Sequence, residues 1–256
     1  FGDIFGDIFG GGGRGPRRGR DISIDIELAF TESVFGVERK VLLQKTSRCD
    51  VCKGSGGKPG AGEMTCPTCN GKGKLHETKR SFMGTFTTTR SCGVCHGVGK
   101  VPKEKCTTCR GAGVLERQEE IVINVPARIQ SGEMIRLAGG GEAIPQGAPG
   151  DLYIKIHVKK DPRFKREEYN IVTTLNIKLT DALLGARYNI DTLDGKVDVT
   201  IPEGATFGEI LRIKGKGVPM GSNKRGDFLI RLNIAVPSKL SKDVKKVIEE
   251  LRNKGI

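Results

Sequence analysis

A chain of 256 residues is longer than one hydrophobic core usually organises, so two or three domains are expected. Only 5% of the residues are aromatic, none is tryptophan and 37 are glycine, which is typical of a strand-and-turn protein with modest cores. The formal net charge of +13 suggests nucleic acid, but lysine and arginine are spread along the whole chain without a recognition helix, so we expect no specific nucleic-acid partner.

The first twenty residues combine a tandem Phe-Gly-Asp-Ile repeat with a glycine run and a basic Pro/Gly stretch. Such a composition cannot bury enough apolar surface to form a core. Residues 1–20 are therefore predicted to be a flexible Gly/Phe-rich linker.

Ordered sequence is expected from Asp21 onward. Apolar and polar residues alternate over residues 22–28, which is the pattern of a half-buried strand. Thr31 can cap a single helical turn that Gly36 closes, and a second strand should follow around residues 41–43.

All eight cysteines lie in four copies of one pattern, C-x-x-C-x-G-x-G. The copies are Cys49-Cys52-Gly54-Gly56, Cys66-Cys69-Gly71-Gly73, Cys92-Cys95-Gly97-Gly99 and Cys106-Cys109-Gly111-Gly113. Two thiolates three residues apart can hold one side of a metal ion, and two such pairs complete the four-thiolate shell that zinc prefers. The pattern thus predicts two Zn²⁺ per chain. The glycines agree with this prediction, because the chain must turn back after each second cysteine, often with positive φ, to point N–H groups at the sulfurs.

Two other roles for the cysteines compete with zinc binding. A disulfide framework suits small secreted domains, and this chain is long, with no cysteine outside the block. A thiol–disulfide oxidoreductase needs an exposed C-x-x-C in a thioredoxin-like setting, whereas these pairs lie in glycine-rich turns, so it remains the alternative function. Thiolates persist in a reducing compartment, and no apolar run is long enough to span a bilayer, so we expect a cytoplasmic location and no membrane partner.

An internal repeat organises the rest of the chain. Residues 125–158 match residues 201–234 at a constant offset of 76, including Gly-x-Gly and Gly-Asp pairs. Residues 28–41 match residues 177–190 at an offset of 149. The two offsets differ because the first copy contains an insert that the second copy lacks, residues 47–119, which we call the cysteine-rich module.

The repeat also predicts which cysteine pairs share a metal ion. Residues 46 and 120 must be near neighbours, because their equivalents in the second copy are consecutive. This brings the first motif to the fourth, while a hairpin of Leu75–Phe82 and Thr85–Thr89, turning at Met83-Gly84, returns the third motif to the second. Sequential pairing of the first motif with the second, and of the third with the fourth, stays open at this point.

The fold class that follows is mainly β, with two homologous domains in tandem and a short helix at the end. The predicted segments are 21–46 plus 120–167 for the first β domain, 47–119 for the module, 168–237 for the second β domain and 238–256 for the terminal helix. Ser241 can cap this helix, and one of its faces carries an apolar stripe of Val244, Val247, Ile248 and Leu251. The stripe either packs on its own domain or pairs with a second chain.

Four C-x-x-C-x-G-x-G motifs inserted into the first of two homologous β domains, after a Gly/Phe linker, resemble the zinc-finger-containing type of the DnaJ chaperone family. The resemblance covers the whole chain. It implies two β-sandwich-like C-terminal domains, one zinc held by Cys49, Cys52, Cys106 and Cys109, and a second held by Cys66, Cys69, Cys92 and Cys95. It also implies a homodimer held by the terminal helices.

For function, the resemblance implies a non-enzymatic co-chaperone that binds extended apolar segments of unfolded proteins and delivers them to a DnaK-type chaperone. The nucleotide exchange factor of that chaperone would be an indirect partner. The client groove is expected between strands of the first domain, with candidate residues Ile22, Val41, Leu43, Leu137 and Phe164. No catalytic arrangement of side chains is recognisable.

One feature of the family is missing from this sequence. The J domain carries a His-Pro-Asp motif that stimulates ATP hydrolysis by DnaK, and none of the three histidines here is followed by Pro-Asp. We therefore expect a chain that starts inside the Gly/Phe region, holds clients and does not stimulate DnaK alone.

Overall fold

The computed structural model describes residues 17–81, 84–221 and 224–255, so most of the predicted linker lies outside the described residues. The fold is mainly β, and contacts divide the chain into two compact units. Unit 1 holds the chain up to Glu27 together with Glu38–Val125 and Ser131–His157, and unit 2 holds Leu28–Val37, Pro126–Gln130 and the chain from Val158. The domain boundaries predicted from the sequence follow the internal repeat and not these contacts, and they stay a prediction. No helix within the described ranges has the length and apolar character needed to cross a membrane.

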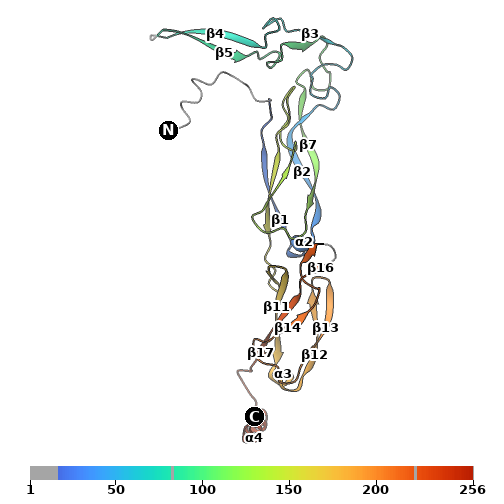
Figure 1. The fold of residues 1–256 in the computed structure, drawn as a ribbon, viewed down its shortest axis with the longest axis vertical. Helices are drawn as coiled ribbons and strands as arrows, with labels where there is room; N and C mark the ends of the chain where they lie inside the picture. Colours follow the sequence, from blue (N-terminus) through green and yellow to red (C-terminus); the bar gives the residue numbers. More distant parts are fainter. Residues whose placement is uncertain (1–16, 82–83, 222–223, 256) are drawn as a thin grey trace. The chain divides into compact units, whose positions relative to one another are not determined.

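The β domain of unit 1 is built from two small sheets (Figure 1). Its strands are β1 (Ile22–Leu28), β2 (Val37–Arg48), β7 (Val114–Val125), β8 (Met134–Leu137) and β9 (Leu152–Val158). One sheet has the order β1-β9-β8, and the other pairs β2 with β7. Strand β9 is the central strand, and its alternate residues Leu152, Ile154 and Ile156 are fully buried. The period-two pattern of the sequence therefore marks the core face.

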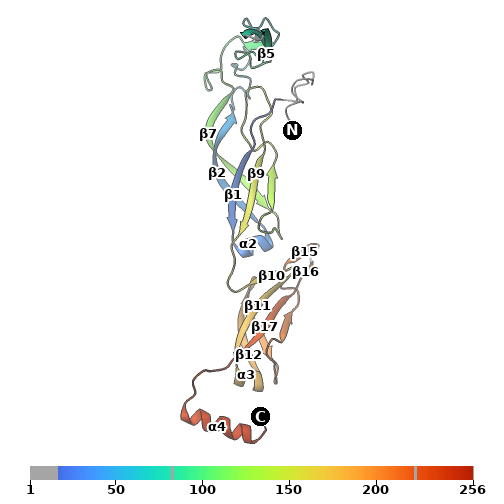
Figure 2. The ribbon, with the colours of Figure 1, turned by 90° about the vertical axis from the view of Figure 1, so that its left-hand side faces the viewer.

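Unit 2 repeats this plan with one larger sheet and a hairpin (Figure 2). Its strands are β10 (Lys165–Glu167), β11 (Asn170–Lys178), β12 (Ala186–Thr192), β13 (Gly195–Ile201), β14 (Ile210–Ile213), β15 (Pro219–Gly221), β16 (Lys224–Arg225) and β17 (Phe228–Ala235), and its helix α3 covers Leu179–Leu184. The main sheet has the order β10-β11-β17-β14, with β11 parallel to β17, while β12 pairs with β13. The core is centred on Phe228, Ile230 and Leu232 of β17.

Helix α2 (Phe30–Phe35) belongs to unit 2 although it precedes β2 in the sequence. Its Val34 is fully buried in the core of unit 2. The predicted cap was wrong: the helix begins before Thr31, and the Glu32 carboxylate accepts the N–H of Ala29 at 2.9 Å, which satisfies the helix start. Gly36 closes the helix with φ 80°, as the sequence predicts.

The two β domains make the same hydrogen bonds at equivalent residues, which confirms that they are homologous copies. The N–H of Ile22 donates to Asp151 O at 2.9 Å, and the N–H of Ile171 donates to Asp227 O at 3.0 Å. The bonds from Gly132 to Ile156 and from Gly141 to Gly150 recur from Gly208 to Leu232 and from Gly217 to Gly226. Residues related by the two sequence offsets therefore occupy equivalent positions in the two domains.

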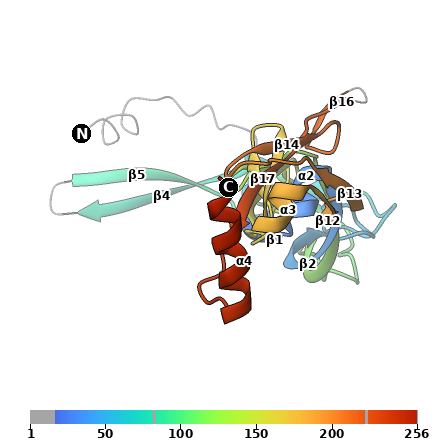
Figure 3. The same cartoon turned by 90° about the horizontal axis from the view of Figure 1, so that it is seen from below.

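The cysteine-rich module lies between β2 and β7 and contains two short pairs of strands. Strand β3 (Glu63–Thr65) pairs with β6 (Lys100–Pro102), and β4 (Lys74–Ser81) pairs with β5 (Gly84–Ser91). Figure 3 shows β4 and β5 as a two-stranded ribbon, which confirms the predicted hairpin. The predicted turn at Met83-Gly84 falls partly on residues 82–83, which lie outside the described residues. Both β2 and β7 run past the predicted ends of the insert.

Helix α4 (Lys242–Asn253) is the last helix of the described chain. Its predicted cap is confirmed, because Ser241 Oγ accepts the N–H of Val244 at 3.3 Å. None of the helix residues from Lys242 to Asn253 is buried, so the apolar stripe faces solvent. The stripe is thus available to a partner.

Asp151 is a buried acid that fixes the turn between β8 and β9. Its carboxylate accepts the N–H of Gly139 at 2.8 Å and pairs with Arg136 and Arg18 at 2.6 Å each, and only 5% of its side chain is exposed. The N–H of Gly139 is the main cause that lowers the pKa of Asp151 to about 2, and the two guanidinium groups act in the same direction. The equivalent Asp227 pairs with a single arginine at 3.4 Å and is more exposed.

Asp151→Asn should therefore destabilise unit 1 more than the matched change Asp227→Asn destabilises unit 2. The folded pKa lies below the ordinary value of 3.8, so the carboxylate stabilises the fold above that pH and loses this effect as the pH falls toward about 2. The difference between Asp151→Asn and the wild type should shrink over the same range. Urea unfolding followed by NMR signals of β9 and β17 tests both statements, and equal effects of the two variants would contradict them.

Candidate functional site

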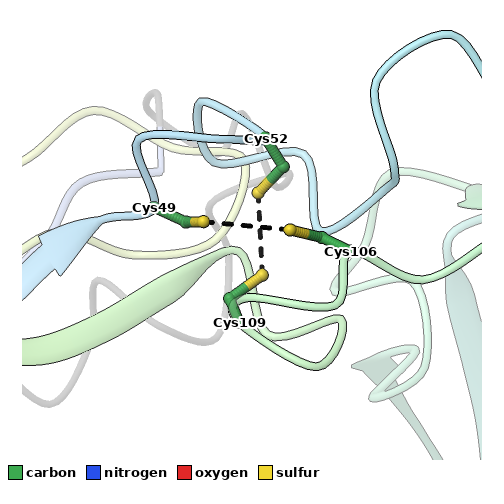
Figure 4. Close-up of side chains that lie close together, drawn as sticks. All are labelled: Cys49, Cys52, Cys106 and Cys109. Carbon is green, nitrogen blue, oxygen red and sulfur yellow. Dashed lines mark hydrogen bonds between the residues drawn. The ribbon is translucent and has the colours of Figure 1, made fainter.

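The eight cysteine sulfurs converge in two groups of four. Centre 1 comprises Cys49, Cys52, Cys106 and Cys109, and centre 2 comprises Cys66, Cys69, Cys92 and Cys95. Figure 4 shows the four side chains of centre 1 pointing at one another from two loops. The grouping joins the first motif to the fourth and the second to the third, which is the arrangement that the repeat offsets favour, and the sequential alternative is not the one found.

The spacing of the sulfurs fits a metal ion with four thiolate ligands. The Sγ atoms of Cys49 and Cys106 are 3.9 Å apart and those of Cys52 and Cys109 are 3.6 Å apart, and centre 2 has the same two distances. A tetrahedral zinc with bonds of about 2.3 Å requires sulfurs separated by about 3.8 Å. The donor set and its size therefore match zinc, and all eight sulfurs are buried.

The second glycine of each motif lets two chain segments approach closely. A Cβ on Gly56 would lie 2.4 Å from Gly111 O, and one on Gly113 would lie 2.6 Å from Gly54 O. The same glycines send their N–H groups to sulfur, with Gly113 donating to Cys109 Sγ at 3.2 Å. Centre 2 repeats these contacts, so each centre consists of two similar turns facing each other.

The residue that follows each second cysteine also takes an unusual conformation, which sequence reasoning missed. Lys53, Asn70, His96 and Arg110 all have φ between 50° and 52°. Asn70 and His96 are residue types that enter this region more readily than most, whereas Lys53 and Arg110 are not, so the four side chains carry no common signal. The paired turns impose the conformation, and the strain indicates a tightly built site.

Backbone donors and burial shift the pKa values of the thiols in opposite directions. The N–H of Cys109 is the main cause that lowers the pKa of Cys106 to about 7, whereas burial raises the pKa of Cys109 to about 11. In centre 2, burial likewise raises the pKa of Cys69 to about 11. Four thiolates at such distances repel one another, and a divalent cation would remove that repulsion and hold all four deprotonated.

Centre 1 is tied to the β domain of unit 1 through the loop of residues 142–150. Arg48 Nη2 donates to Gly147 O at 2.6 Å. The N–H of Gln146 donates to Gly54 O and its Nε2 donates to Ser55 O, both at 3.2 Å. The turn of the first cysteine motif therefore contacts a loop that precedes β9.

The residues predicted to contact a client are divided between the two units. Ile22, Val41, Leu43 and Leu137 belong to unit 1, where the first three are half-buried and Leu137 is 37% exposed. Phe164 lies in the core of unit 2, 4% exposed and edge-on to the ring of Phe228 at 5.8 Å. Phe164 thus belongs to the core of unit 2, and the expectation that it lines a groove with the residues of unit 1 stays a prediction.

The equivalent positions of the second copy are closed. Ile171, Ile190 and Thr192 correspond to Ile22, Val41 and Leu43, and all three are buried. Among the described strands, β1 and β2 each have a hydrogen-bonded neighbour on one side only. Unit 1 thus offers partly open apolar residues beside unpaired strand edges.

Comparison with known proteins gives consistent matches. A sequence model described as the DnaJ C terminal domain matches residues 22–237. "Chaperone protein DnaJ" of Acetivibrio thermocellus is 40% identical over 252 residues, covering 98% of this chain and 65% of that protein. The proteins of the same name from Ruminiclostridium cellulolyticum and Prochlorococcus marinus subsp. pastoris are 43% and 36% identical, covering 98% and 94% of this chain and 69% and 65% of their own lengths. The chain thus spans about two thirds of the length of these relatives.

Proposed function

This chain belongs to the DnaJ family, and from that premise we propose that it binds extended apolar segments of unfolded proteins and passes them to a DnaK-type partner. The curated relatives are named as chaperones, which is a non-enzymatic role. We place client binding in unit 1, at the open edges of β1 and β2. The two cysteine centres are proposed to hold structural zinc, and a cytoplasmic location is proposed with them.

The difference in burial between the two copies carries the proposal. Ile22, Val41 and Leu43 are half-buried where their equivalents in the second copy are buried. An extended segment that adds a strand to a free sheet edge gains backbone hydrogen bonds that do not depend on its sequence, and an open apolar position beside the edge can take one of its side chains. The first copy has both features.

The burial of the thiols supports structural zinc over the oxidoreductase alternative. A reactive C-x-x-C needs an accessible thiolate, whereas all eight cysteines here are buried and four backbone N–H groups point at their sulfurs. Residues Cys49, Cys52, Cys106 and Cys109 would hold one ion and Cys66, Cys69, Cys92 and Cys95 the other. When bound, the ions would hold the turns of the module together.

Leu43→Ser should weaken the binding of a Leu-rich peptide about ten-fold, or about 1.4 kcal/mol, because one apolar contact is lost. Fluorescence titration of a labelled peptide measures this change. The matched control is Thr192→Ser at the equivalent position of the second copy, where affinity should stay unchanged. Full affinity in a Leu43→Ser protein that is folded and metal-loaded would show that the groove lies elsewhere.

A further inference from the structure

The loop of residues 142–150, called the clasp loop here, holds the segment that leads into β1. The N–H of Gly19 donates to Ala148 O at 2.8 Å, and the N–H of Ala148 donates back to Arg17 O at 2.9 Å. The N–H of Glu142 donates to Arg20 O at 3.0 Å. Residues 17–20 are therefore attached to the clasp loop along their backbone.

Glycines make this attachment possible. A Cβ on Gly19 would lie 1.8 Å from Glu142 O, and one on Gly150 would lie 2.1 Å from Arg20 O. A Cβ on Gly147 would meet Arg17 O at 2.7 Å. Any side chain at these positions would push the two segments apart, so the close approach requires glycine at all three positions.

The other side of the clasp loop contacts centre 1. Gln146 reaches Gly54 O and Ser55 O, and Arg48, which directly precedes Cys49, reaches Gly147 O. Gly54 and Ser55 form the turn after Cys52. The position of this turn depends on the four sulfurs of centre 1 remaining grouped. The clasp loop thus lies between residues 17–20 and centre 1, with hydrogen bonds to both.

We propose that occupation of centre 1 by metal holds residues 17–20 and the start of β1 in place through the clasp loop, with Arg48 and Gln146 as positioning residues. The link continues into β1, because Asp21 Oδ1 accepts the N–H of Asp151 at 2.7 Å and Ile22 donates to Asp151 O. Since Ile22 lies at the proposed client-binding edge of β1, metal in centre 1 also holds that edge in position. This last step rests on the proposed function, whereas the coupling itself does not.

The second copy provides an internal comparison. Its equivalent loop forms the short hairpin of β15 and β16, and Met220 on it is exposed. The inner contact is kept, since the N–H of Val218 donates to Tyr169 O at 2.9 Å. What the second copy lacks is the module, so coupling to a metal centre is confined to the first copy.

Amide hydrogen exchange of the whole chain tests the coupling, with Gly19, Ala148 and Glu142 as reporters. Cys106→Ser removes a ligand of centre 1 and should speed exchange at these amides about ten-fold, the effect of losing one or two hydrogen bonds on a local opening. The matched control is Cys92→Ser, which removes the equivalent ligand of centre 2 and should leave the three amides unchanged. Equal exchange in both variants would overturn the proposal.

A second variant keeps the test informative if Cys106→Ser disturbs the module more widely. Arg48→Ala combined with Gln146→Gly removes two of the hydrogen bonds to centre 1 and leaves every cysteine in place. The reporters should then exchange about ten-fold faster with both metal ions bound. Chelation should accelerate exchange less than in the wild type, because, of the hydrogen bonds described above, only the backbone bond from the Gln146 N–H to Gly54 O still joins the clasp loop to centre 1. If chelation accelerates exchange in this variant as much as in the wild type, the clasp loop is not the route. Peptide affinity of Leu43→Ser is a separate readout, so the client groove and the coupling can fail independently.

Discussion

Replacing Cys49 by serine should lower the bound metal from two ions per chain to one. Its Sγ lies 3.9 Å from that of Cys106 in a four-sulfur group, and three thiolates with a hydroxyl make a much weaker zinc shell. Because structural zinc contributes on the order of 10 kcal/mol to the fold of its site, the turns of centre 1 should open locally. Elemental analysis of the purified variant gives the metal content, and amide exchange at Gly56 and Gly113 reports the opening.

Cys66→Ser is the matched control at centre 2, and it should also leave one ion. The double variant Cys49→Ser/Cys66→Ser distinguishes the two ways of grouping the motifs. With the grouping found here it has no intact centre, whereas sequential pairing of the motifs would leave one. One retained ion in the double variant would therefore contradict the assignment of ligands.

Charged residues on the apolar face of α4 should turn a dimer into monomers. Val244, Val247, Ile248 and Leu251 follow the i, i+3, i+4, i+7 spacing of one helix face, and all four are exposed. We propose that this face pairs with a second copy of the chain. Val247→Asp with Ile248→Asp removes two apolar side chains per copy, which should raise the dimer dissociation constant by more than about 100-fold.

Sedimentation equilibrium measures this dissociation constant directly. Lys245→Asp with Lys246→Asp is the matched control, because it changes neighbouring residues of the same helix outside the stripe and should leave the chain dimeric. If the wild type is a monomer at high concentration, or if the variant with aspartate at Val247 and Ile248 keeps its mass, α4 is not the dimer contact.

Much of the architecture could be predicted from patterns that are local or periodic. The spacing of Cys49 and Cys52 makes a pair of ligands whatever surrounds them, since three residues of chain fix how far two sulfurs can separate. The repeat offsets brought the first motif to the fourth, because an insert must leave and re-enter its host loop at neighbouring points. Ser241 predicted the start of a helix, because its hydroxyl accepts the N–H of Val244 only three residues away and needs no distant partner.

Other features were decided only by the tertiary structure. Alternation over β1 shows that Ile22 faces a core, but not that this core is less closed than the one over Ile171 in the second copy. The sequence shows that Phe164 and Val34 are apolar but not which core they join. Only the path of the chain places both in the core of unit 2. The clasp loop could not be predicted, because its contacts join residues about ninety to one hundred and thirty positions apart and most of the donors and acceptors are backbone atoms. Backbone donors and acceptors are the same in every residue, so they leave no signal in the sequence.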